Sequence, residues 1–151
     1  MAMPSKVRIF EVGARDGLQN EKQMVPSDIK VELIERLVDA GVRSIETGSF
    51  VSPKWVPQMA DTADVMAKIS RRDDVTYAVL TPNMKGYEGA LASKADEIEI
   101  FSAASEMFNQ RNINCSIAES LERFAPVTEA ATAAGIPYRA SRRRRRCEKA
   151  L

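Results

Sequence analysis

The sequence predicts an α/β fold of the (β/α)8-barrel (TIM-barrel) class, here a half-barrel of the first four βα units and the start of a fifth strand. Short apolar runs alternate with segments whose apolar residues recur every three or four positions, and no antiparallel hairpin signal separates them. This alternation is typical of a parallel sheet covered by helices. Polar residues follow each of the first four runs, and a site assembled from several βα loops favours a barrel. A doubly wound sheet often carries a glycine-rich phosphate turn instead, and the sequence contains no GxGxxG motif.

The first unit begins with KVRIFEVG, residues 6–13, an apolar run that predicts a strand and leads into a polar loop. Ser27 is expected to cap a helix that continues to about Ala40 and stops at Gly41. Five apolar residues of this helix recur at spacings of three and four, which predicts a stripe facing the core: Ile29, Leu33, Ile34, Leu37 and Val38.

The next units repeat the pattern. Strands are expected at 42–48, 75–81 and 96–104, and helices at 60–70 and 84–93. The run at 42–48 is short and apolar enough for a buried strand.

The fourth helix opens with a capping signal. Ser116 stands three residues before Glu119, a spacing at which each side chain satisfies the free backbone N–H of the other residue. Gly135 is the expected stop, and Pro126 predicts a kink inside the helix because proline removes a hydrogen bond there. IPYRA, residues 136–140, then starts the fifth strand.

The composition excludes several classes of protein. A chain of 151 residues that is 44% hydrophobic and 28% charged fits one soluble globular unit. No apolar run approaches the roughly 20 residues of a membrane span, and the first ten residues lack the features of a leader peptide. Cys115 and Cys147 form neither a disulfide framework nor a zinc-type spacing. We therefore expect a cytoplasmic protein with no membrane partner.

The last eleven residues read SRRRRRCEKAL and match no packed element. We divide the chain into a half-barrel domain, residues 1–140, and an aberrant Arg-rich tail, residues 141–151, which we expect to be disordered. Five arginines could bind nucleic acid, but they have no flanking aromatic residues and no basic domain face beside them. We expect no nucleic-acid partner.

Four blocks of the sequence together resemble the hydroxymethylglutaryl-CoA lyase family, in its bacterial type: EVGARDGLQNE, IETGSFVSPKWVPQMAD, VLTPNMKGYEGA and FSAASEMFNQRNINCSI. The resemblance extends from about Val7 to Arg139. RDGLQ alone would indicate only the wider group of metal-dependent barrel lyases and Claisen-condensing synthases, whereas the long SFVSPKWVPQMAD block points to the lyase.

This resemblance implies a reaction and three central residues. The reaction is the cleavage of 3-hydroxy-3-methylglutaryl-CoA to acetyl-CoA and acetoacetate, a retro-Claisen step of leucine catabolism that needs Mg²⁺ or Mn²⁺. Asp16 matches a carboxylate metal ligand, and Arg15 matches a catalytic residue whose guanidinium lies on the thioester oxygen. Glu46 matches a glutamate that holds Arg15 and the metal shell in position.

Gln19 and Asn112 match positions near the acyl-CoA substrate, and Ser49 is expected as a further substrate contact. Taken singly, each candidate also has an ordinary structural interpretation. An Asp after a strand is usually a turn residue, and an Arg there is usually a salt-bridge partner. Only the intact RDGLQNE block gives Arg15 and Asp16 their functional interpretation.

The sequence also departs from the family. The family barrel needs about 250 residues, and the resemblance places two metal-binding histidines, a metal-binding asparagine and an acid/base cysteine in its second half. This chain has no histidine. We expect an incomplete portion that is inactive alone, with exposed half-barrel edges open to self-association. Two alternatives remain: a related condensing synthase or aldolase, and a non-catalytic half-barrel that serves as an interaction module.

Overall fold

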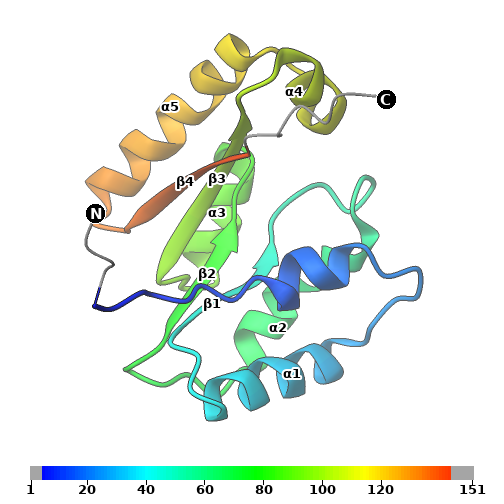
Figure 1. The fold of residues 1–151 in the computed structure, drawn as a ribbon, viewed down its shortest axis with the longest axis vertical. Helices are drawn as coiled ribbons and strands as arrows, with labels where there is room; N and C mark the ends of the chain where they lie inside the picture. Colours follow the sequence, from blue (N-terminus) through cyan, green and yellow to red (C-terminus); the bar gives the residue numbers. More distant parts are fainter. Residues whose placement is uncertain (1–4, 144–151) are drawn as a thin grey trace.

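The computed structural model of the protein describes residues 5–143, which form one four-stranded parallel sheet with helices along its outer face (Figure 1). The strands are β1 Ser44–Ser49, β2 Thr76–Leu80, β3 Glu97–Ala103 and β4 Tyr138–Arg143. They lie side by side in sequence order, and each neighbouring pair is parallel. Because a doubly wound sheet reverses its order at a switch point, this one-directional order is that of an opened barrel.

Helices precede or connect the strands: α1 Ser27–Asp39, α2 Thr62–Lys68, α3 Met84–Ala92, α4 Glu106–Ile113 and α5 Ile117–Ala133. Two short turns complete the described elements, a π-helical turn η1 Gly13–Gly17 and a 3-10 turn η2 Pro57–Met59. Helices α1, α2, α3 and α5 confirm the four helices that the sequence predicts. Helix α4 was not predicted. No helix in the described part of the chain combines the length and apolar character needed to cross a bilayer.

The ends of α5 confirm the predicted capping signals. The Ser116 hydroxyl accepts from the Glu119 amide at 3.1 Å, and the Glu119 carboxylate accepts from the Ser116 amide at 2.7 Å. Gly135 follows the helix with φ +69°, a conformation that glycine adopts without strain. Pro126 lies inside α5 and does not end it.

The prediction of a strand at residues 6–13 is wrong. The segment joins the sheet through one bridge only, in which the Glu11 amide donates to the Ser44 carbonyl at 2.9 Å. The Glu46 amide completes it by donating to the Glu11 carbonyl at 2.8 Å. Val7 and Ile9 remain 70% and 72% exposed, because no described strand lies against their side of the segment. Apolar character alone therefore does not make this segment a strand.

The domain boundary expected at residue 140 also needs correction. Strand β4 continues three residues further, to Arg143, and pairs with β3 along its whole length. The Ser141 hydroxyl donates to the Glu99 carboxylate of β3, so this residue belongs to the packed sheet. The remainder of the expected tail, residues 144–151, lies outside the described residues.

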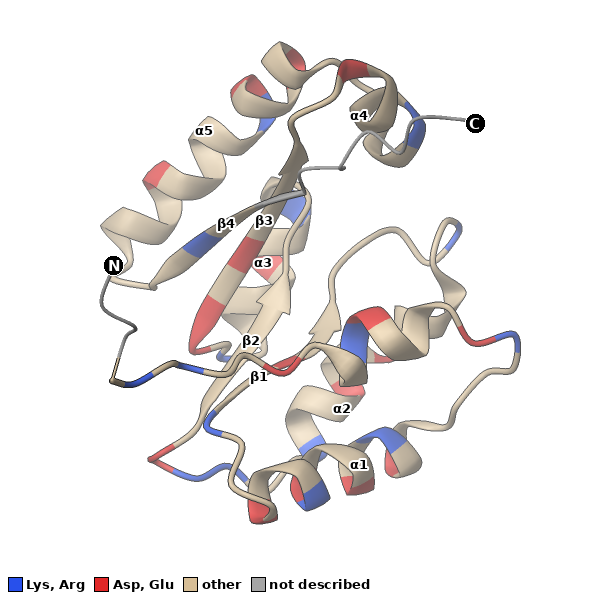
Figure 2. Ribbon diagram, viewed as in Figure 1, with Lys and Arg blue, Asp and Glu red and all other residues tan. Residues whose placement is uncertain are grey.

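The core lies between the outer face of the sheet and the helices. Ile34 and Val38 of α1 are buried there as predicted, but Ile29 is more than half exposed. Lys30 takes its place on the buried side, since residues 30, 34 and 38 stand one above the other at helical spacing. The opposite, concave face of the sheet carries charged residues of β3 and β4 (Figure 2).

Candidate active site

The turn η1 places Arg15 and Asp16 directly after the bridge to β1. The Arg15 and Asp16 amides both donate to the Val12 carbonyl, at 3.1 and 2.7 Å. The Glu11 carboxylate accepts from the Gly13 amide at 2.6 Å and so fixes the start of the turn. A Cβ at Gly13 would lie 2.7 Å from that carboxylate oxygen, so a side chain there would displace the Glu11 carboxylate. Glu11 thus holds the loop through the backbone.

The three predicted central residues meet at one guanidinium. Arg15 Nη2 lies 2.9 Å from Glu46 Oε2, and Arg15 Nη1 lies 2.9 Å from Asp16 Oδ1. The Glu46 side chain is 0% exposed, that of Arg15 is 12% exposed and that of Asp16 is 56% exposed. The guanidinium is therefore held between a fully buried carboxylate and one that faces solvent. Two opposed ion pairs fix its orientation before any substrate arrives.

Burial raises the pKa of Glu46 from 4.5 to about 7. The cation of Arg15 opposes this shift, the negative charge of Glu99 adds to it, and Arg139 opposes it. The contact between Glu46 and Arg15 is a close ion pair without the direction of a hydrogen bond, and neither Glu46 oxygen has a hydrogen-bond partner among the described residues. Near neutral pH, Glu46 therefore sits close to the point where it gains or loses its charge.

Ser49 ends β1 and is almost fully buried. Its amide donates to the Thr62 hydroxyl at 3.1 Å, which ties the end of the strand to α2. The Ser49 hydroxyl has no hydrogen-bond partner among the described residues. A buried hydroxyl without a partner is costly, and it is available to a ligand that enters the site. The role of Ser49 as a substrate contact stays a prediction.

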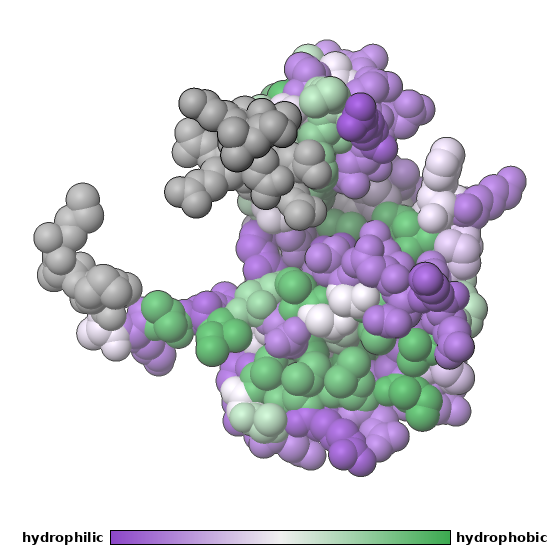
Figure 3. Space-filling view, turned by 45° about the vertical axis from the view of Figure 1, so that its right-hand side comes forward, coloured by the Kyte–Doolittle hydropathy of each residue, from purple (hydrophilic) through white to green (hydrophobic). Residues whose placement is uncertain are grey.

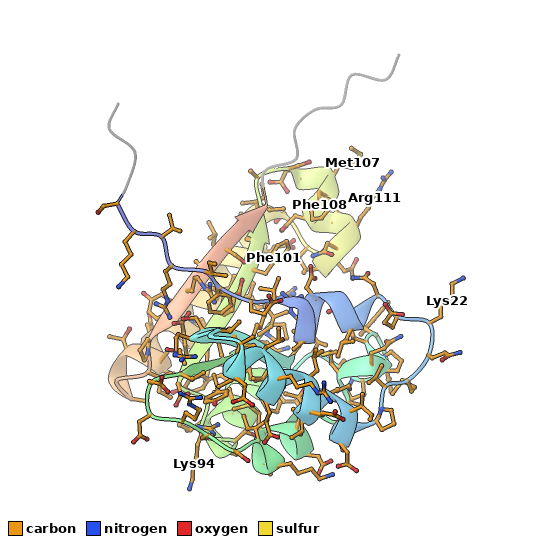
Figure 4. All side chains as sticks on the ribbon, turned by 60° about the horizontal axis from the view of Figure 1, so that its bottom comes forward. Lys22, Lys94, Phe101, Met107, Phe108 and Arg111 are labelled. Atoms are coloured by element: carbon orange, nitrogen blue, oxygen red, sulfur yellow. The ribbon has the colours of Figure 1, made fainter. Side chains whose placement is uncertain are left out.

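Gln19 and Asn112 lie in different surroundings. Gln19 is half-buried on the short helical stretch that continues from η1, three residues after Asp16. Asn112 is exposed on α4. Figure 4 labels Met107 and Arg111 of the same helix, which lie at the end of the sheet opposite to Lys94. The structure therefore keeps Gln19 beside the Arg15 turn and places Asn112 on a separate helix, and the substrate roles of both stay predictions.

The buried asparagine of α4 is Asn109, which sequence reasoning missed. Its side chain accepts from the Ala103 amide at 3.1 Å and donates to the Ser116 carbonyl at 2.9 Å. It thereby joins the end of β3 to the start of α5. Asn109 is fully buried and its amide is satisfied by these contacts, so its role is structural.

Two further charged residues of the concave face were also missed. Glu99 of β3 is buried, and Arg139 of β4 lies across it with Nη2 3.4 Å from Glu99 Oε2. The signal was present in the EIEIF run, because the glutamates alternate with isoleucines and must face away from the isoleucine side.

The described residues do not complete a metal site. No group of three or more Asp, Glu, Cys or His side chains is placed among them to share an ion. Asp16 is a carboxylate open to solvent, which suits one ligand of a hard divalent cation, but one of its oxygens already contacts Arg15. We therefore derive no chemical step through a metal from this part of the chain.

A profile of the HMGL-like family matches residues 6–147. The mitochondrial hydroxymethylglutaryl-CoA lyase of Gallus gallus is 57% identical over 138 residues, which are 91% of this chain and 46% of the relative. The 3-hydroxy-3-isohexenylglutaryl-CoA/hydroxy-methylglutaryl-CoA lyase of Pseudomonas aeruginosa is 61% identical over 131 residues, 87% of this chain and 44% of the relative. The chain thus spans about half the length of the curated relatives it matches.

Solved structures agree with these relatives. The crystal structure of the Pseudomonas aeruginosa hydroxymethylglutaryl-CoA lyase superposes with a TM-score of 0.90 at 57% identity, over 94% of this chain and 47% of that chain. An Acinetobacter baumannii lyase in complex with coenzyme A and 3-methylmalate superposes with a TM-score of 0.83 at 36% identity, over 87% of this chain and 43% of that chain. The described residues form half of a TIM barrel, which confirms the predicted fold class. The chain belongs to the HMGL-like family.

Proposed function

We propose that the protein to which this chain contributes cleaves 3-hydroxy-3-methylglutaryl-CoA to acetyl-CoA and acetoacetate. The observation that carries this proposal is the Arg15 guanidinium held between buried Glu46 and exposed Asp16, in a chain 57% identical to a lyase that bears this activity in its name. The site residues are a proposal as well: Arg15 and Glu46 act in catalysis, Asp16 binds metal, and Gln19, Ser49 and Asn112 contact the acyl-CoA.

The reaction needs a stabilised enolate. A base removes the proton of the 3-hydroxyl, the bond between carbons 2 and 3 breaks, and carbon 3 becomes the ketone of acetoacetate. The electron pair of the broken bond forms the enolate of acetyl-CoA, which is then protonated on carbon. Negative charge therefore develops on the thioester oxygen. A guanidinium fixed in advance beside that oxygen stabilises the charge without rearranging, and this is the role we propose for Arg15.

Members of the HMGL-like family are metal-dependent. We propose Mg²⁺ or Mn²⁺ as the ion, since Asp16 offers a hard oxygen ligand. When bound, a divalent cation would make the 3-hydroxyl more acidic. The other ligands do not come from the described residues. We further propose a cytoplasmic location, although several relatives are mitochondrial by name.

A chimera tests this proposal. Residues 1–140 are joined to the remaining portion of the Pseudomonas aeruginosa lyase, and acetoacetate formation is measured with Mg²⁺ or Mn²⁺. The chimera should cleave the thioester, and Arg15→Met should lower kcat roughly 100-fold or more, by analogy with the loss of one enolate-stabilising donor. Asp16→Asn should lose activity through weaker metal binding. Arg36→Met removes an exposed arginine of α1 and should leave the rate unchanged.

Two outcomes would contradict the proposal. Full activity of the Arg15→Met chimera would show that the RDGLQNE block is only scaffold. Condensation of acetyl-CoA with a 2-oxo acid, without thioester cleavage, would instead assign the protein to the synthase branch of the same barrel group. The 151-residue chain alone should show negligible turnover, because its described residues supply one of the metal ligands.

A further inference from the structure

The concave face of the sheet carries a second charged cluster that the reaction above does not use. It consists of Glu97 and Glu99 of β3 and Arg139 of β4, and we call it the concave cluster. In Figure 2 the red positions of β3 and the blue position of β4 lie side by side on this face.

Arg139 holds the concave cluster together. Its Nη2 lies 3.2 Å from Glu97 Oε1 and 3.4 Å from Glu99 Oε2, so one guanidinium nitrogen serves two carboxylates. The guanidinium carbon lies 3.1 Å from the centre of the Phe10 ring, which packs the cation against the N-terminal segment. The Ser141 hydroxyl donates to the other oxygen of Glu99. The orientation of Arg139 is therefore fixed by contacts to two separate segments, β3 and the N-terminal segment.

Glu97 and Glu99 lie two strands away from Glu46, and Arg139 lies three strands away from it. In the sheet register, Glu46 of β1 is opposite Ala78 of β2, and Ala78 is opposite Glu97 of β3. Two strand spacings are about 10 Å. Ala78 is fully buried and has only a methyl side chain, so it offers no polar group that would screen one charge from the other. Charges at this separation in a protein interior still interact appreciably.

We propose that Arg139 and Glu99 are positioning residues, which act across the concave face to keep Glu46 as the ion-pair partner of Arg15. The direction of each influence is clear: the negative charge of Glu99 raises the pKa of Glu46, and the positive charge of Arg139 lowers it. The charged groups that face Glu46 are Arg15 from η1, Glu99 from β3 and Arg139 from β4, while β2 presents the uncharged Ala78.

The consequence for catalysis follows from the ion pair. If Glu46 takes up a proton, the attraction that holds Arg15 Nη2 is lost and the guanidinium is free to leave the thioester position. Arg139 reduces the protonated fraction of Glu46 near neutral pH by offsetting Glu99. This consequence rests on the lyase function proposed above, whereas the electrostatic coupling itself does not.

The coupling is tested on the 151-residue chain by following the carboxyl carbon of Glu46 by NMR as a function of pH. Arg139→Met should raise the midpoint by up to about one pH unit, since its charge lies three strand spacings, roughly 14 Å, from Glu46 along the sheet. Glu99→Gln should lower it, and the double variant should titrate close to the wild-type protein because the two removed charges offset each other. Arg139→Lys, which keeps the charge, should also stay near wild type.

Arg36→Met serves as the matched control, since it removes an exposed arginine far from the concave face and should not move the midpoint. A midpoint that responds to neither Arg139→Met nor Glu99→Gln would overturn the proposal. If Arg139→Met fails to fold, Glu99→Gln and Arg139→Lys still decide, because a midpoint that Glu99→Gln does not lower contradicts the coupling.

The chimera adds a readout that a purely structural role would not move. The acid limb of kcat/KM should shift to higher pH in Arg139→Met and return in the double variant. Unchanged pH profiles, together with a shifted Glu46 midpoint, would overturn the positioning role. An inactive wild-type chimera would count against the proposed function, and the NMR titration would still decide whether Glu46 is coupled to the concave cluster.

Discussion

Among the single residues of the site, Glu46 is the carboxylate whose ionised form is most disfavoured by burial. It is fully buried, its two oxygens have no directed hydrogen bond among the described residues, and Arg15 is its one close cation. Such a group is tolerated in a protein interior only where it is paired or serves a function. The same burial raises the pKa of the Glu46 carboxyl to about 7.

This pKa leads to a prediction for stability. The folded-state pKa of Glu46 lies above the ordinary value of 4.5, so the folded protein binds this proton more tightly than the unfolded chain. The resulting contribution is fully present below about pH 4.5 and is lost as pH rises through about 7, a change of a few kcal/mol. Glu46→Gln should therefore flatten the fall in the free energy of unfolding between about pH 5 and pH 8.

Urea denaturation at several pH values across this range measures the effect. Glu32→Gln, which neutralises an exposed glutamate of α1, is the control and should leave the slope unchanged. Identical slopes for the wild-type protein and Glu46→Gln would show that the carboxylate is already ionised well below pH 7 and that the burial argument is wrong.

The residues of the site were only partly predictable from sequence. Arg15, Asp16 and Glu46 follow from the resemblance, and the structure brings them together. Arg139 and Glu99 were not singled out as site residues. The alternation within a strand shows which of its residues share a face. It does not show that charged residues of different strands, such as Glu99 and Arg139, meet on the same face of the sheet.

At the scale of elements, α1 is joined to the loop between β1 and α2 by a buried lysine. Lys30 donates to the Gln58 carbonyl and to Asp61 Oδ1, both at 2.5 Å. Gln58 in turn donates to the Glu21 carbonyl at 2.9 Å, so the loop after η1 belongs to the same arrangement. The loop after η1 and the loop between β1 and α2 are thereby fixed relative to α1.

Lys30→Met should destabilise the fold by about 1–3 kcal/mol, because the Gln58 carbonyl and Asp61 lose a buried partner. Lys68→Met is the matched control. Lys68 also joins α2 to α1, through Asp28, but it is well exposed and its loss should cause no resolvable change. Thermal and urea denaturation measure both variants. Equal effects of the two substitutions would mean that burial does not decide the value of these contacts.

The bulge in β1 gives a second prediction at this scale. The register shifts between Glu46 and Gly48, and a Cβ at Gly48 would lie 2.6 Å from the Thr62 side chain. Gly48→Ala should therefore push α2 away from the strand and cost about 1–3 kcal/mol. Gly17→Ala is the control, since nothing lies within 4 Å of its added methyl group. A Gly48→Ala protein as stable as Gly17→Ala would show that Thr62 moves aside freely.

The elements themselves were predictable where apolar periodicity and capping coincide, as in α5 with its capping box. Helix α4 was missed because its buried residue is the polar Asn109, so no apolar stripe marks it. The prediction of a strand at residues 6–13 failed for the opposite reason. The apolar pattern of the segment suits a strand, but a strand also needs hydrogen-bonding neighbours, which the sequence alone does not show.

For the whole molecule, the open sheet has two edges. The outer edge of β4 has no described neighbour, and the N-terminal segment touches β1 through one bridge only. Figure 3 shows apolar side chains gathered on the lower part of the molecule, where Figure 1 has α1, and further ones on the projecting N-terminal segment. Val7 and Ile9 of that segment and Ile29 of α1 are each more than half exposed. Open edges beside apolar surface favour association.

We therefore predict that the chain associates with a second copy as its concentration rises. A twofold axis parallel to the strands would bring β4 of one copy beside the N-terminal segment of the other in parallel orientation, and would close both edges at once. Size-exclusion chromatography with light scattering should show a mass that increases with concentration. Combined Val7→Lys and Ile9→Lys should lower the association while leaving the circular dichroism unchanged, because both side chains are already exposed. Leu91→Lys on α3 removes an exposed apolar side chain elsewhere and should have no such effect. A stable monomer at every concentration would contradict this reasoning, since it would show that the open edges and the apolar surface beside them are satisfied within one copy.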